Sequence, residues 1–203
     1  MSRKVLDKLT SAVGAVLVVV LVVAGGLLTW GHSFVSQNVH DQLAQQQIFF
    51  PPKAAFAHPK AGTEIAPSMI PSVSQYAGQQ LLTGPQAKVW ANDSIAVHLS
   101  EMPYGGVYSK ASAAAMKDPN NAKVQGVVAT IFKGTTLRGL LLEAYAFSTI
   151  GAVMLWGAIA SFILAALLAV LVGLGLWHAA RTPQEKQVLD AKVAKGPEPV
   201  PAA

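Results

Sequence analysis

His98 and Glu101 are the two side chains whose types and spacing come nearest to a metal site in this chain. On a predicted helix, the pattern His-x-x-Glu places both side chains on neighbouring positions of one surface. A catalytic metal normally takes three protein ligands, and no second histidine cluster lies nearby in the sequence. His98 also falls on the apolar helix face, where a core histidine bonded to a neighbour is the simpler interpretation. We therefore predict no metal, no cofactor and no catalytic residue, with a metal-assisted enzyme as the remote alternative.

Other signatures of enzymes are weak as well. Ser94 and Ser109 lack the Gly-x-Ser-x-Gly setting of an activated serine. The Gly-Gly pairs at 25–26 and 105–106 lack the residues of a phosphate-binding loop. The chain contains no cysteine, which excludes thiolate chemistry and disulfide bonds. These features favour a non-enzymatic protein.

Two long uncharged stretches are the elements that must position everything between them. No Asp, Glu, Lys or Arg occurs in residues 9–40 or in residues 144–180. Because a bilayer core of about 30 Å needs roughly 20 apolar residues in a helix, we predict membrane-spanning helices over residues 12–30 and 149–177. The chain is thus expected to be a multi-pass protein of the cell membrane.

The first stretch also allows a second interpretation, a cleaved signal peptide ending near Ala24. The apolar run continues through Leu28, and no Ala-x-Ala site follows at a suitable distance. This continuation favours an uncleaved anchor.

Basic residues predict the orientation of the two spans. They flank the pair at Arg3, Lys4 and Lys8 before the first span and at Arg181, Lys186, Lys192 and Lys195 after the second. Positive flanks favour the cytoplasmic side. Residues 1–11 and a disordered tail over 178–203 are therefore expected in the cytoplasm, and residues 31–148 outside it.

The segment between the spans predicts an all-α extracytoplasmic domain. Helical patterns of apolar residues or helix start and stop signals occur over 34–48, 85–102, 107–116, 119–133 and 136–145. Gly134 is expected to separate the last two helices, and the proline-rich segment 51–71 is expected to be extended. Eight Lys or Arg against six acids in residues 31–148 provide no concentrated basic face, so a nucleic-acid partner is not expected.

Four side chains near the spans are candidates for interfacial or ligand contacts. Phe49, Phe50 and Phe56 are too apolar for a free linker, so we expect them to pack onto the helical domain or to enter the lipid headgroups. Arg138, which precedes the second span, is expected to position this helix at the interface or to contact a lipid headgroup.

Small residues recur at four-residue steps in the second span and predict a helix-packing face. This small-residue stripe consists of Gly157, Ser161, Ala165, Ala169 and Gly173. Its expected neighbour is the first span, another membrane subunit or a further copy of the chain.

Four short segments resemble a family of actinobacterial membrane proteins. They are QIFFPPK at 47–53, QYAGQQ at 75–80, GPQAK at 84–88 and LRGLLLEAY at 137–145. The resemblance covers nearly the whole chain and implies two spans, but it implies no activity because the family is functionally uncharacterised. Members often carry the name aromatic ring-opening dioxygenase, whose chemistry needs an open iron site, typically with two His and one carboxylate. This sequence shows no convincing site of that kind.

The sequence is compatible with three functional hypotheses. The leading hypothesis is an accessory, scaffold or assembly subunit of a cell-envelope complex, with membrane lipids and other membrane subunits as partners. The alternative is an extracytoplasmic module that binds a lipid or another small ligand. The metal-assisted enzyme is the third.

Overall fold

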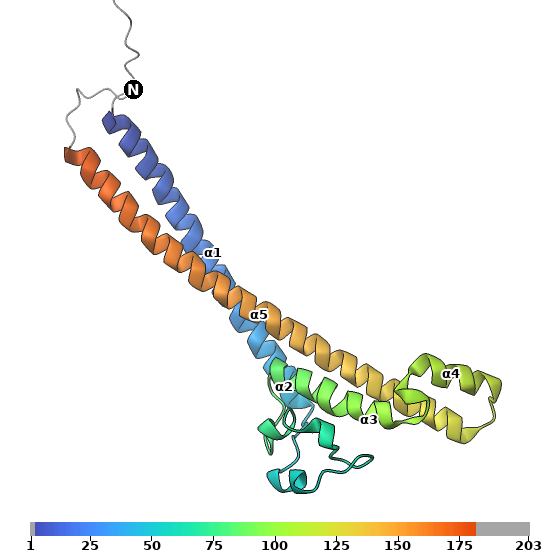
Figure 1. Cartoon of the computed structure of the whole chain (residues 1–203). Coiled ribbons are helices and arrows are strands. Elements are labelled where there is room, and N and C mark those ends of the chain that lie inside the picture. Colours follow the sequence, from blue (N-terminus) through green and yellow to red (C-terminus); the bar gives the residue numbers. More distant parts are fainter. Residues whose placement is uncertain (1–2, 182–203) are drawn as a thin grey trace, which may run out of the picture. The chain divides into compact units, whose positions relative to one another are not determined.

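The structure, a computed structural model, describes residues 3–181 and is all-helical (Figure 1). Two long helices, α1 (Arg3–Gln45) and α5 (Ala122–Arg181), precede and follow the shorter elements in the sequence. The shorter elements are the 3-10 turns η1 (Lys53–Ala57), η2 (Pro67–Met69) and η3 (Ser74–Tyr76), α2 (Gly84–Val89), the π-helical segment η4 (Trp90–Ile95), α3 (Ala96–Glu101), the 3-10 turn η5 (Pro103–Gly106) and α4 (Tyr108–Lys117). Residues 3–181 contain no β-strand, so the all-helical prediction is confirmed for this part of the chain.

Both α1 and α5 are long and apolar enough to cross a membrane. The expected spans, residues 12–30 and 149–177, lie inside these helices, which extend well beyond them. The expected disordered tail over 178–203 begins within α5, which ends at Arg181. The rest of that tail lies outside the described residues.

The division of α5 into three helices is wrong. Gly134 lies inside the helix, and a Cβ atom there would come within 2.9 Å of Leu99 Cδ2. A glycine costs a helix only about 1 kcal/mol, and here its missing side chain makes room for the packed leucine. Asn121 caps the start of α5, since its Oδ1 accepts hydrogen bonds from the Lys123 and Val124 amides at 3.1 and 3.3 Å.

The described residues form two compact units. Unit 1 contains α1 through Leu28 and α5 from Trp156, and unit 2 contains Thr29–Leu155. Each unit is described separately below.

Unit 1 is an antiparallel pair of helices. Ser11 lies against Gly175, and Leu28 lies against Gly157. Most covered positions recur at alternating three- and four-residue steps, at 7, 11, 14, 18, 21, 25 and 28 on α1 and at 158, 161, 165, 168, 172, 175 and 179 on α5, and positions 24 and 157 beside these series are covered as well. This period of 3.5 is the pattern of left-handed helix pairs, and the other faces expose apolar side chains.

A core in unit 2 joins α1, α2, α5 and the segment between Gln46 and Thr83. Phe50 is only 2% exposed. Its ring packs against the rings of Tyr76 and Trp90, with a distance of 5.1 Å between ring centroids in both pairs. The chain predicted to be extended over residues 51–71 is extended only in part, because η1 and η2 lie within it. Proline at φ near −65° suits such turns as well as an extended chain, and the turns bury Ile65, Ala66 and Met69.

Three hydrogen bonds close the neck of this segment. The Phe50 amide donates to the Gln79 carbonyl at 2.8 Å, and the Leu81 amide donates to the Ile48 carbonyl at 2.9 Å. The Gln80 side-chain amide donates to the last turn of α1, at the Ala44 carbonyl, at 3.0 Å. The segment therefore leaves and re-enters the core at nearly the same place.

The helix predicted over 85–102 is confirmed at 84–101, with a π-helical turn in its middle. Thr83 caps it, since its hydroxyl accepts from the Gln86 amide at 3.4 Å while Gln86 Oε1 accepts from the Thr83 amide at 3.0 Å. The helix predicted over 107–116 is confirmed as α4.

Candidate functional site

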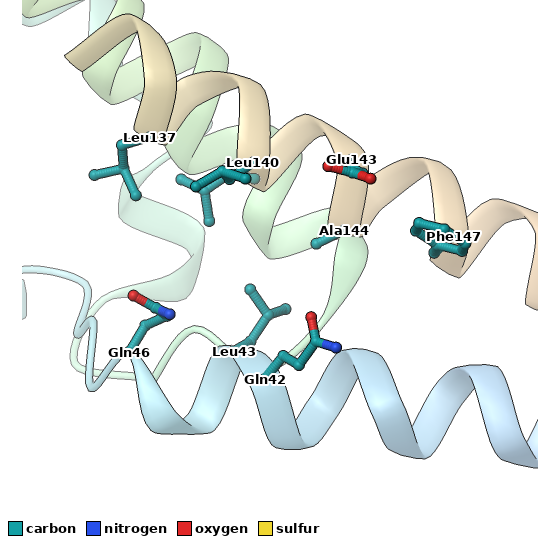
Figure 2. Close-up of a pocket in the computed structure, with 9 residues that line it drawn as sticks. Gln42, Leu43, Gln46, Leu137, Leu140, Glu143, Ala144 and Phe147 are labelled. Atoms are coloured by element: carbon teal, nitrogen blue, oxygen red, sulfur yellow. The ribbon is translucent and has the colours of Figure 1, made fainter. Parts of the chain in front are cut away.

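A groove lies between α1 and α5 in unit 2, around the first residues of the uncharged stretch of α5 (Figure 2). Its volume is about 340 Å³. It is lined by Gln42, Leu43, Gln46, Leu137, Leu140, Leu141, Glu143, Ala144 and Phe147. Most of this lining is apolar, with polar groups at a few positions only.

A second hollow of about 190 Å³ continues the groove along α1. It shares Gln42 and Phe147 with the first and adds Phe34, Val35 and Asn38. We call the two hollows together the α1–α5 groove. Its far end lies at Phe34, whose ring stacks on Trp30 at 5.7 Å.

The helical repeat explains why these side chains line one groove. Phe34, Asn38 and Gln42 follow one another at four-residue steps on α1 and so share one side of the helix. Gln46 follows in the turn after α1. In Figure 2 the side chains of Gln42 and Gln46 point from α1 toward α5.

The polar groups of the groove are three amides and one carboxylate. The Gln42 amide nitrogen donates to Asn38 Oδ1. Glu143 is exposed on α5, and within residues 3–181 its carboxylate has neither an ion pair nor a hydrogen bond. The groove can therefore hold an apolar chain and offer acceptor oxygens to a polar group that donates hydrogen bonds.

Sequence reasoning missed this groove. The four-residue steps of Phe34, Asn38 and Gln42 were a usable signal for one wall. The opposite wall, around Ala144 and Phe147, lies about a hundred positions further along the chain, and only the folded pairing of α1 with α5 joins the two.

His98 and Glu101, the candidate metal ligands, lie together beside an open depression that also contains Glu64. His98 is partly exposed, and Glu101 Oε1 accepts a hydrogen bond from the Gly62 amide at 3.2 Å. The part of the chain that the structure describes has no group of three side chains suited to a metal ion. The depression therefore provides no complete metal site.

The aromatic candidates do not form one surface. Phe50 belongs to the core, Phe49 beside it is 58% exposed, and Phe56 is partly buried against the core. The Arg138 side chain contacts η4, because its Nη2 donates a hydrogen bond to Asn92 Oδ1 at 2.9 Å. None of these four residues lines the α1–α5 groove.

The small-residue stripe covers two different faces of α5. Gly157, Ser161 and Ala165 lie on the side covered by α1. Ala169 and Gly173 are exposed, and a Cβ at Gly173 would have no atom within 4 Å. Steps of four residues rotate about 40° per step around an α-helix, so the stripe leaves the contact face within a few steps.

No family model matches the chain, and neither the curated proteins nor the solved structures contain a significant match to it. The resemblance to the actinobacterial family therefore stays a prediction, and function has to be argued from the groove itself.

Proposed function

We propose that this chain is a non-enzymatic protein of the cell membrane whose α1–α5 groove binds a membrane lipid. In this proposal α1 and α5 cross the bilayer, both termini are cytoplasmic and unit 2 is extracytoplasmic. One observation carries the proposal. The groove begins at exposed aromatic side chains where the uncharged stretches of both helices end.

The level of the groove fits a lipid headgroup. Trp30 ends the expected first span, and tryptophan is enriched where a bilayer core meets its headgroups. Phe34 and Asn38 lie one and two turns further along α1, or roughly 6 and 12 Å at 1.5 Å per residue. The headgroup layer is itself several ångströms thick. The acyl chains could stay in the bilayer while the headgroup reaches the amides.

The polar groups favour one headgroup chemistry. A carboxylate accepts hydrogen bonds and cannot donate them, and Glu143 is the charged residue in the lining of the groove. A headgroup with a primary ammonium, such as ethanolamine, supplies both a positive charge and N–H donors. The quaternary ammonium of choline supplies only the charge.

Filling the groove tests the proposal. Ala144→Phe places a ring inside the groove, whereas Ala146→Phe adds the same ring at an exposed position of the same helix. We expect native mass spectrometry of the full chain in mild detergent to show bound phospholipid in the wild type and in Ala146→Phe, and much less in Ala144→Phe. Equal retention in all three proteins would contradict a groove site.

Glu143→Gln tests the headgroup. It removes the charge with little change in shape, so ethanolamine lipid should lose its advantage over choline lipid. The expected loss is on the order of tenfold, as for one charge-assisted hydrogen bond. An unchanged ratio would leave lipid binding intact but would contradict the role of the carboxylate.

An accessory subunit of an envelope complex is the second candidate, and a different surface favours it. Met116 is 73% exposed and Phe132 is 54% exposed, and the Phe132 ring packs on Tyr108 at 5.7 Å. Such apolar side chains suit contact with another membrane subunit. Photo-crosslinkers at Met116 and Phe132 should then capture one and the same protein, which a crosslinker at the exposed Lys123 should not. Different or no captured proteins would contradict this candidate.

A further inference from the structure

Arg138 carries a charge that its surroundings in unit 2 do not balance. Its Nη2 donates to the neutral Asn92 Oδ1 at 2.9 Å, while its Nε is buried without a hydrogen-bond partner. Within residues 3–181 no carboxylate lies within 4.0 Å of the guanidinium. A partly buried cation normally has a counter-charge, because removing it from water is costly. No carboxylate of the described residues therefore supplies this counter-charge.

Arg138 is one of the residues that line an open surface cavity with room for an anion. The cavity measures about 310 Å³. It is lined by Ala96, Leu99, Ser100, Gly105, Gly106, Val107, Tyr108, Thr135 and Arg138. All of these residues belong to unit 2.

Hydroxyl groups in the cavity complete the set of donors. Thr135 and Tyr108 are both exposed, and their hydroxyls have no hydrogen-bond partner within the described part of the chain. Ser100 already donates to the Val97 carbonyl at 2.7 Å, so it is less available. One charged donor and two free hydroxyls are suited to an oxyanion.

We propose that this cavity binds a phosphate or carboxylate group through the Arg138 guanidinium, with the Thr135 and Tyr108 hydroxyls as further donors. The site is separate from the α1–α5 groove. Arg138 and Glu143 are five residues apart, which places them about 140° from each other around α5. The two sites therefore carry opposite charges on different faces of one helix.

Equilibrium dialysis of the full chain in mild detergent against radiolabelled inorganic phosphate tests the proposal. We expect saturable binding at one site per chain, weakened at least about tenfold by Arg138→Gln, the change expected for loss of a charge-assisted hydrogen bond. Lys133→Gln removes an exposed cation from the same helix and should leave binding unchanged. Absence of saturable binding in the wild type, or equal binding by Arg138→Gln, overturns the proposal.

A second variant keeps the test valid if Arg138→Gln fails to fold. Thr135→Val removes a cavity hydroxyl without touching the bond between Arg138 and Asn92, and it should weaken phosphate binding several-fold. Unchanged binding in Thr135→Val, with Arg138→Gln unfolded, overturns the proposal because the cavity then takes no part.

Competition identifies the source of the oxyanion. Nanodiscs containing phosphatidic acid should displace the labelled phosphate if the natural ligand is a lipid phosphate, whereas choline-lipid nanodiscs should not. Displacement by acetate alone would assign a carboxylate ligand. Displacement by unlabelled inorganic phosphate alone would assign a free phosphate. Each of these results supports the oxyanion site, and labelled phosphate that unlabelled phosphate does not displace contradicts it.

Discussion

Gly84 lies at the closest approach between α2 and α5. A Cβ atom at this position would lie 2.6 Å from Ser148 Oγ and 3.3 Å from Tyr145 Cα. The Tyr145 Cα is a backbone atom, so it cannot move away by a side-chain rotation. The residue is also buried at the first position of α2. Its missing side chain therefore allows the two helices to pack together.

Gly84→Ala should destabilise unit 2 by about 1–3 kcal/mol, the usual cost of overpacking. Gly139→Ala is the matched control, because a Cβ there would have no atom within 4 Å and alanine favours a helix by up to about 1 kcal/mol. Thermal unfolding in mild detergent should show a lower midpoint for the first variant and an equal or higher one for the second. A midpoint of Gly84→Ala at or above that of the wild type would contradict the close approach.

At the residue scale the sequence indicates which side chains are unusual but not which residues they contact. Arg138 stands out in the sequence as a charge before an apolar helix. Its partner Asn92 lies 46 positions away, and only the packing of η4 on α5 joins them. Phe49 and Phe50 are equivalent by composition, yet the fold buries one and exposes the other. Phe49 pairs with Gln80 in an isolated β-bridge. Neighbouring side chains on extended backbone point to opposite sides, so Phe50 faces the core while Phe49 faces outward.

The pairing of α1 with α5 in unit 1 depends on a period of 3.5 residues. The four-residue pattern of small side chains favours a straight contact face, but such a face rotates away from its neighbour. Helices over residues 12–30 and 149–177 follow directly from their uncharged, apolar composition, whereas the continuity of α5 from Ala122 does not. Their contact face depends on both helices at once, so one stripe alone does not define it.

Ser11→Cys combined with Gly175→Cys should form a disulfide on mild oxidation. A Cβ at Gly175 would lie 3.9 Å from Ser11 Cβ, within the 3.5–4.5 Å range of disulfides. The chain has no cysteine of its own, so thiol counting with a maleimide reagent measures the bond without background.

The matched control is Ser11→Cys with Gly173→Cys, which places the second thiol on an exposed face two residues away. This pair should stay reduced under the same conditions. If both pairs oxidised equally fast, or if the control pair were the faster, the antiparallel register of unit 1 would be wrong.

The continuity of α5 illustrates a limit at the same scale. Gly134 and the polar residues around it indicate a break when the sequence is read locally. The helix continues because Leu99 fills the space beside the glycine. Tertiary packing therefore keeps α5 continuous at a position where the local sequence pattern predicts a break.

At the scale of the whole molecule, the charges at the two ends of the apolar stretches set the proposed orientation. Lys8 and Lys60 are both exposed, one in unit 1 and one in unit 2. A charged reagent does not cross a bilayer, so the two positions report on opposite sides if the proposal is correct.

A membrane-impermeant maleimide should therefore label Lys60→Cys in intact cells and should label Lys8→Cys only after the cells are opened. The absence of native cysteine again removes the background. Labelling of Lys8→Cys in intact cells, with protection of Lys60→Cys, would show the reverse orientation. Labelling of both would indicate that α1 does not cross the membrane.

The segment between Gln46 and Thr83 is held at its neck, so unit 2 does not need an unbroken chain at the exposed tip of this segment. Residues 60–64 are exposed, whereas Ile65 is buried again and the neck is held at Phe50 and Leu81. A protease that cuts after Lys60 would leave two fragments that both remain anchored in the same core. The tip is accordingly the place where this chain can be split, or lengthened by a fused reporter, while unit 2 stays folded.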